Sequence, residues 1–189
     1  MSVVNTDNYT ISGVSLFFHT TIANASLNAT ETGFATFRND NNSLGNIVTG
    51  EFTPDVTYVD HWVSVNGKRV KDKTVENVVA LTINFTFDEM NVTNLEKYFL
   101  ANSTGSVLDV MQNTTDEGSA IVYIHTDIGR DMQYVIPKCT IKPDGGLALN
   151  IEDWWTGSMM MEILQYQSSD GSNATWLAAP LGQLHLNYH

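Results

Sequence analysis

Histidine and acidic residues at short spacings are the first candidates for chemistry in this chain. His185 and His189 stand four residues apart, a spacing that can hold a metal ion when both side chains lie on one face of a helix. The residues around them favour a strand or a tail and lack the accompanying glutamate, so we expect a surface end there. His125 and Asp127 share one face of an expected strand and could pair, but no nucleophile is near them in sequence. With His185 they would make a metal-dependent hydrolase, the least favoured class.

Two adjacent carboxylate pairs and one cysteine are the remaining candidates for reactive groups. Asp88-Glu89 and Glu152-Asp153 could each contribute to a cation site, but acidic turns are more often solvated. A structural role is expected for Asp60-His61. Cys139 lies in an apolar run and is expected to be a small core residue. Because no nucleophile elbow, phosphate-binding loop or dinucleotide fingerprint occurs either, the sequence predicts no enzyme, no cofactor and no metal site.

The charge balance argues against tight nucleic-acid binding. The chain has 9 Lys and Arg against 21 Asp and Glu, a net charge of −12. Affinity for phosphate comes mainly from clustered basic residues, so this protein could lie beside DNA without adhering to it. On charge alone, a soluble acidic surface is the first explanation. The single cysteine excludes an internal disulfide and fits synthesis in a reducing cytoplasm. We also expect no membrane insertion and no signal peptide, because the chain lacks a long apolar run and residues 1–10 lack a basic start.

Asn-x-Ser/Thr triplets recur along the chain, and we attribute them to its Asn- and Thr-rich composition because no signal peptide is expected. A glycosylated archaeal or viral product is the alternative. The triplets begin at Asn8, Asn24, Asn28, Asn41, Asn84, Asn91, Asn102, Asn113 and Asn173.

Alternating apolar and polar residues predict strands in the first half of the chain. The strands expected there are residues 9–18, a short one near 34–37, 47–61 and 74–87. Residues 19–46 form a long loop excursion rich in Asn, Thr, Ala and Gly. Pro54 indicates a bulge or an edge position, because proline has no N–H to donate within a sheet.

One helix and a second group of strands follow. A helix is predicted at residues 91–101, because Asn91 or Thr93 can cap it. Its apolar stripe for packing on a sheet consists of Leu95, Tyr98 and Phe99. The later strands are 120–127, 132–142, 147–151 and 176–186, with a tight turn at 143–146 and with 159–166 open between strand and short helix. Residues 1–189 are therefore expected to form one mainly β domain, a sandwich or barrel of about seven to nine antiparallel strands with one flanking helix.

A long hairpin with a basic tip is the most unusual feature of the sequence. Asn66-Gly67 is a favourable type I′ turn, so residues 61–74 are expected to project beyond the sheet. A solvated tip is the common explanation of its charge. The alternative is a positive arm that docks on an acidic surface of another copy, a contact that propagates into rings or stacks. The predicted assembly contacts are Trp62, Asn66, Gly67, Lys68, Arg69, Lys71 and Lys73.

An ordered string of residues in the first half of the chain carries a resemblance to a known family. It comprises Gly33-Phe34, Leu44-Gly45-Asn46-Ile47, Asp60-His61, Ser64, Gly67, Arg69, Lys71 to Val75, Ile83 to Glu89 and the expected helix from Asn91 to Leu100. Over residues 33–105 this string resembles the tail tube (major tail) proteins of tailed bacteriophages. The C-terminal half agrees only in its strand-rich texture, and residues 20–42 depart from the pattern by their length.

The resemblance implies a structural virion protein. Proteins of that family form hexameric rings that stack into a hollow tail tube, and the long hairpin reaches the adjacent ring. The implied partners are further copies of the chain, a tape measure protein, and DNA that passes through the lumen to the host during genome ejection. Sheath, tail terminator and baseplate or tip proteins are further candidates. The implied location is the phage tail, after synthesis in the host cytoplasm, and an acidic lumen would let DNA slide by.

Two other classes stay open at the level of sequence. A receptor- or carbohydrate-binding β-sandwich is the main alternative, because aromatic platforms hold sugars and the chain has four tryptophans, at Trp62, Trp154, Trp155 and Trp176. A related tube from a bacterial secretion or injection machine is the other.

Overall fold

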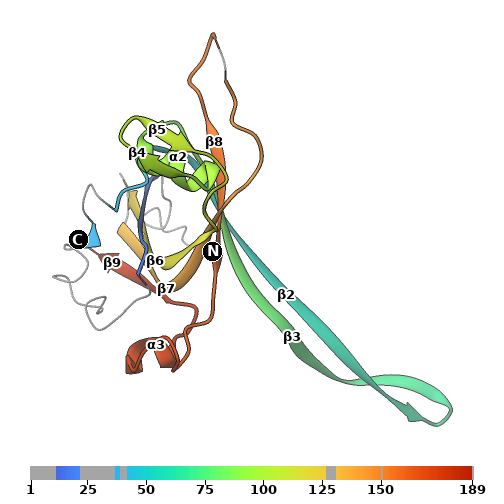
Figure 1. Cartoon of the computed structure of the whole chain (residues 1–189). Helices are drawn as coiled ribbons and strands as arrows, with labels where there is room; N and C mark the ends of the chain where they lie inside the picture. The colour runs from blue at the N-terminus through green and yellow to red at the C-terminus, as the bar shows by residue number, and fades with distance from the viewer. Residues whose placement is uncertain (1–11, 22–36, 39–41, 127–130, 150, 189) are drawn as a thin grey trace, which may run out of the picture.

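The fold is mainly β, as the alternating sequence predicts. A computed structural model, shown in Figure 1, describes residues 12–21, 37–38, 42–126, 131–149 and 151–188. The strands of this part are β1 (Ser12–His19), β2 (Ile47–Val65), β3 (Lys68–Phe87), β4 (Asn102–Thr104), β5 (Val107–Asp109), β6 (Asp116–Thr126), β7 (Asp131–Pro143), β8 (Gly157–Ile163) and β9 (Gln183–Tyr188). Its helices are α2 (Val92–Phe99) and α3 (Ala174–Ala178).

One antiparallel sheet holds most of the strands. Six of them lie in the order β1-β6-β7-β8-β3-β2, and β9 pairs with residues 131–135 of β7. Residues 139–143 of β7 pair with β8, so β8 and β9 follow one another along the same edge of β7. Residues 42–44 bond to β1 through two backbone hydrogen bonds of 2.7 and 2.9 Å. Because these residues lead into β2, the contact links the two ends of the sheet, and the sheet curls around a common interior.

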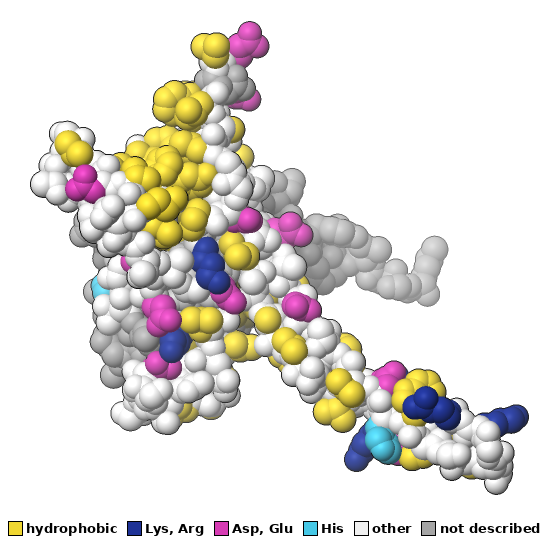
Figure 2. Space-filling model, turned by 45° about the vertical axis from the view of Figure 1, so that its right-hand side comes forward, with side chains coloured by type: hydrophobic (Ala, Val, Ile, Leu, Met, Phe, Trp, Pro, Cys, Tyr) yellow, Lys and Arg dark blue, Asp and Glu magenta, His cyan; other side chains and the backbone are white. Residues whose placement is uncertain are grey.

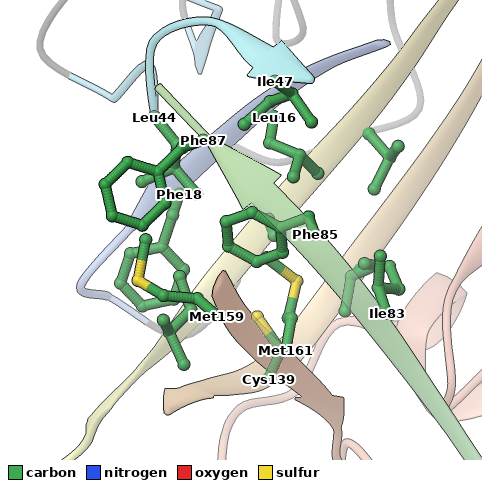
Figure 3. Packing of buried hydrophobic residues seen from close by; sticks show 14 of the residues in the cluster. Leu16, Phe18, Leu44, Ile47, Ile83, Phe85, Phe87, Cys139, Met159 and Met161 are labelled. Atoms are coloured by element: carbon green, nitrogen blue, oxygen red, sulfur yellow. The ribbon is translucent and has the colours of Figure 1, made fainter. Parts of the chain in front are cut away.

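Apolar side chains from β1, β3, β7 and β8 fill that interior (Figure 3). The alternation of β3 places Ile83, Phe85 and Phe87 inside, each 2% exposed or less. Burial of such side chains contributes roughly 1.5–3 kcal/mol each, so the body has a core of its own. The other fully buried members of this core include Leu16, Leu44, Cys139, Ile141, Met159 and Met161.

A smaller apolar cluster lies apart from this interior. The fully buried Trp176 of α3 packs there with Tyr166, Ile121 and Val135. Because β6 and β7 supply residues to both clusters, the central strands are covered on both faces, as in a sandwich.

Helix α2 fixes the point at which the chain enters β2. Its N-cap is Asn91, whose side chain accepts a hydrogen bond from the Asn94 backbone at 2.8 Å. The fully buried Asn94 donates through Nδ2 to the carbonyls of Leu44 and Glu89, both at 2.9 Å. Gly45 has a φ of +75°, and a Cβ there would overlap the Glu89 side chain, so glycine is required. The predicted helix is thus confirmed, and it anchors the root of the hairpin.

The predicted strand at residues 147–151 is wrong. In this stretch Ala148 forms an isolated bridge with Thr156, and the chain otherwise runs through a long connection between β7 and β8. Gly145 has a φ of +83° and turns the chain away from the sheet, so the glycines open a loop where a tight turn was expected. Residues 159–166, left open by the sequence, form β8 up to Ile163.

The predictions of a single helix and of a closing strand at 176–186 also need correction. Asn173 caps the second helix, α3, by accepting a hydrogen bond from the Thr175 backbone at 3.0 Å. The strand β9 begins only at Gln183. The short β4–β5 hairpin was not predicted, because three-residue strands are too short to show a period. The predictions for residues 9–11 and 34–36 lie outside the described residues.

Candidate assembly interface

The β2–β3 hairpin extends far beyond the body of the protein (Figure 1). Its strands have 19 and 20 residues, whereas strands in globular proteins usually have three to ten. The neighbouring strand β8 pairs with β3 only from Leu81 to Phe87. Beyond that point β2 and β3 continue as a two-stranded ribbon, residues 55–80, which we call the arm. At about 3.3 Å per residue it is roughly 35 Å long.

The arm is exposed on both faces. Every residue from Asp55 to Val79 is exposed except Val63, which is half-buried. Of the twenty-two large apolar side chains that are exposed in the described part of the chain, nine lie on the arm. They are Val56, Tyr58, Val59, Trp62, Val65, Val70, Val75, Val78 and Val79. Exposed apolar side chains gathered on one projecting element are typical of an interaction site.

The turn at the tip is the one that the sequence predicts. Asn66 has a φ of +50° and Gly67 a φ of +75°, both positive as a type I′ turn requires. Pro54 lies on the edge strand β2 opposite Leu81, so its predicted edge position is confirmed. The pairing of β2 with β3 shifts register between residues 47 and 49, at the root of the hairpin, and on the arm between 57 and 58 and between 61 and 62. Bulges increase twist and discourage edge-to-edge pairing, which leaves the faces of the ribbon as its contact surfaces.

The two faces of the arm differ in chemistry. Directly opposite residues share a face, so the register assigns each side chain. One face, the valine face, carries Val59, Val63, Val65, Val70, Val75 and Val78. The other, the aromatic face, carries Val56, Tyr58, Asp60, Trp62, Arg69, Lys71, Thr74 and Val79.

Part of the basic tip is neutralised within the arm. Lys71 Nζ lies 2.7 Å from an Asp60 carboxylate oxygen, and Thr74 Oγ1 donates to the same oxygen at 2.9 Å. These contacts, Lys71 first, hold the pKa of Asp60 below its ordinary value of 3.8. The Arg69 guanidinium lies over the Trp62 ring, 6.0 Å from its centroid.

The remaining basic residues of the tip, Lys68 and Lys73, belong to the valine face by register. His61 Nδ1 lies 2.6 Å from the Asp72 carboxylate on this side of the ribbon. In the described part of the chain, Lys68 and Lys73 form no ion pair within 4.0 Å. Their charge is therefore available to another surface.

The rest of the molecule has the opposite charge. Outside residues 47–87 the sequence has five basic and sixteen acidic residues, a net charge of −11, whereas residues 47–87 have four and five, a net charge of −1. Three of the five basic residues of the body are paired locally: Lys97 with Asp116, Lys138 with Asp170 and Lys142 with Glu162. The negative charge of the body therefore comes from carboxylates that these three lysines do not neutralise.

A second projection extends from the body on the side away from the arm. It is the connection between β7 and β8, residues 144–149 and 151–156, which we call the apical loop (Figures 1 and 2). The Tyr98 hydroxyl donates to the Gly145 carbonyl at 2.8 Å and fixes its base to α2. The apical loop contains three acidic residues and no basic one. Its exposed large apolar side chains are Leu149, Ile151, Trp154 and Trp155. The sequence pattern does not predict this loop, although the Gly145-Gly146 pair is a signal for it.

Among the described residues, the candidate catalytic side chains do not assemble into a reactive site. His125 Nδ1 lies 3.2 Å from Asp131, which also accepts hydrogen bonds from the Tyr123 hydroxyl at 2.6 Å and from the Thr126 backbone at 2.9 Å. The Tyr123 bond, followed by the Thr126 bond, lowers the pKa of Asp131 to about 2. These contacts join β6 to β7, so the Asp131 carboxylate has a structural role. Asp127 and His189 lie outside the described residues.

The other titratable candidates also have structural surroundings. The Asn46 side chain donates to Asp88, and its backbone N–H donates to Glu89, so this acidic pair fixes the entry into β2. Burial lowers the pKa of His185 on β9 and raises the pKa of the Cys139 thiol, which lies in the core as expected. Among the described residues, no three His, Cys, Asp or Glu side chains are grouped closely enough to hold a metal ion.

The four tryptophans are divided among separate places. Trp62 lies on the arm, Trp154 and Trp155 lie on the apical loop, and Trp176 is fully buried. They therefore do not form one platform for a sugar.

The sequence matches no protein-family model and no curated protein. Neither described helix is long and apolar enough to cross a membrane. The arm, the apical loop and the charges on them are therefore the features of the molecule that bear on its function.

Proposed function

We propose that this chain is a structural subunit that self-assembles through its arm into stacked, hexameric rings, which together form a hollow tube. The observation that carries the proposal is the arm itself. Nine large apolar side chains are exposed on a ribbon, residues 55–80, with which no third strand pairs in the described part of the chain. An isolated two-stranded ribbon is marginally stable in water, so a surface of this size needs a partner.

A second copy is the partner that fits best. The arm projects from one side of the body, and its two uncompensated lysines would be attracted by the acidic surface of a neighbour. A contact between two different surfaces of the same protein does not close as a dimer, and it continues into a ring or a stack. This is the arrangement that the resemblance to phage tail tube proteins implies.

The charge of the body suits a tube that conducts DNA. A lumen built from subunits with a net charge of −11 outside residues 47–87 would repel the phosphate backbone and let it slide. In this proposal the tube is part of a phage tail, a tape measure protein occupies it before DNA, and the chain has no enzymatic role.

Electron microscopy of the purified protein tests the proposal. We expect rings or hollow tubes about a hundred ångströms wide, the size of a ring of six domains of this length. Monomers alone, at every concentration and salt condition, would rule out self-assembly as its function.

Carbohydrate or receptor binding is the second candidate, and the exposed Trp154 and Trp155 on the apical loop favour it. Binding to a glycan array that is lost on replacing Trp154 by Ala would support it. An array without signal would leave assembly as the better account.

A further inference from the structure

The proposed function leaves open which surface receives the arm, and we propose that it is the apical loop of the next copy. The inference rests on the proposed assembly, since it names the partner surface of the same contact. The occupant of the apical loop is then the valine face of an arm, with Lys68 and Lys73 beside it.

Charge complementarity is the first argument. The apical loop carries Asp144, Glu152 and Asp153 without a basic residue between Pro143 and Gly157. All three carboxylate residues are exposed. On the arm, Lys68 and Lys73 form no ion pair in the described part of the chain. Opposite charges of this kind align two surfaces and speed their association.

Matching apolar surface is the second argument. Leu149, Ile151 and Trp154 are 64%, 101% and 80% exposed, so these large side chains obtain little burial within their own copy. The valine face offers exposed valine side chains to such a surface. Interfaces are enriched in aromatic residues, and tryptophans within them contribute strongly to binding.

The position of the two projections is the third argument. In both Figure 1 and Figure 2 the apical loop extends from the top of the body, and the arm leaves the side of the body and runs obliquely away from the loop. An arm therefore points away from the loop of its own copy and toward the space that a stacked neighbour would occupy. Repeated along an axis, the same contact joins each ring to the next.

A charge-exchange experiment tests the assignment. Lys68→Glu with Lys73→Glu is the arm variant, and Asp144→Lys with Asp153→Lys is the loop variant. Each is expected to raise the concentration at which the protein assembles by about tenfold, and their combination in one chain is expected to return it to within about threefold of the wild-type value, because paired groups are coupled. Glu117→Lys, on an exposed β6 position away from both surfaces, is the matched control.

Cross-linking gives an independent readout that does not depend on charge. A Lys68→Cys chain mixed with an Asp153→Cys chain is expected to form a disulfide-linked dimer under oxidation, whereas either chain alone is not; Cys139 is fully buried and does not compete. Wild-type assembly without rescue and without the cross-link would overturn this assignment and leave the proposed function intact. Absence of assembly in the wild-type protein would instead refute the proposed function.

Discussion

Lys71 Nζ lies 2.7 Å from the Asp60 carboxylate, across the two strands of the arm. In the sequence the four basic residues of the tip look alike, but this ion pair makes their surroundings differ. Lys71 is neutralised by its own copy, whereas Lys68 and Lys73 form no ion pair in the part of the chain that the structure describes. The four basic residues are therefore expected to contribute unequally to assembly.

A matched pair of neutral substitutions tests this difference. Lys73→Gln is expected to raise the assembly concentration by about two- to fivefold, since it removes a charge that attracts the neighbour, and Lys71→Gln by less than about twofold. The measurement is light scattering against protein concentration at low and moderate salt. Equal effects of the two substitutions would show that the ion pair with Asp60 has no bearing on docking.

The valine face is expected to be buried on assembly. Val59 and Val75 are directly opposite one another, and replacing both by Thr keeps their branched shape and their preference for strands. Burial of two added hydroxyls without partners costs about 1–3 kcal/mol each, so the assembly concentration should rise at least about tenfold. Val107→Thr, at a position 60% exposed on β5, is the control and should leave assembly unchanged. If Val59→Thr with Val75→Thr assembles like the wild type, the valine face is not part of the contact.

Asn94 is expected to stabilise the body and the root of the arm. Asn94→Ala leaves the Leu44 and Glu89 carbonyls without their buried donor, at an expected cost of about 1–3 kcal/mol. The free energy of unfolding in urea measures it. Asn91→Ala, which removes the cap of α2 and an exposed hydrogen bond to Glu89, is expected to cost about 1 kcal/mol. A smaller loss for Asn94→Ala than for Asn91→Ala would contradict this view of the junction.

The Asp131 cluster makes stability depend on acid pH. The pKa of Asp131 is about 2 in the folded protein and 3.8 ordinarily, so its contribution is complete above about pH 4 and is lost as the pH falls toward 2. The difference in unfolding free energy between the wild type and Asp131→Asn should therefore shrink over that interval. Tyr123→Phe removes the largest cause of the shift and should weaken this pH dependence. A difference that stays constant down to pH 2 would mean that Asp131 titrates normally.

The sequence predicts the hairpin but not the size of its exposed part. Asn66-Gly67 identifies the turn, because few residue pairs tolerate two positive φ angles. Along β2 and β3, however, valines occupy both faces, and the same pattern would suit a strand buried on both sides. The arm is uncovered because β8 stops pairing with β3 at Leu81. This end point depends on tertiary structure, so no local sequence pattern predicts it.

The Asp60–Lys71 ion pair and the apical loop also depend on tertiary structure that the sequence does not predict. The cluster of lysines is visible in the sequence, but the Asp60–Lys71 pair depends on a bulge between residues 61 and 62 that sets the register. Residues 147–151 alternate like a strand, yet in the described part of this stretch only Ala148 pairs, in an isolated bridge with Thr156. Helix α2 was predictable, because Asn91 and its apolar stripe act locally.

Electron microscopy of an armless variant tests the central claim most directly. Replacing residues 56–79 by Asn-Gly joins the opposite residues Asp55 and Ala80 by the same kind of turn and leaves the core residues of β3 in place. We predict that this variant keeps the circular dichroism and cooperative unfolding of a folded body and forms no stacked tubes, while the intact protein forms them under the same conditions. Tubes of equal length from both proteins would contradict assembly through the arm.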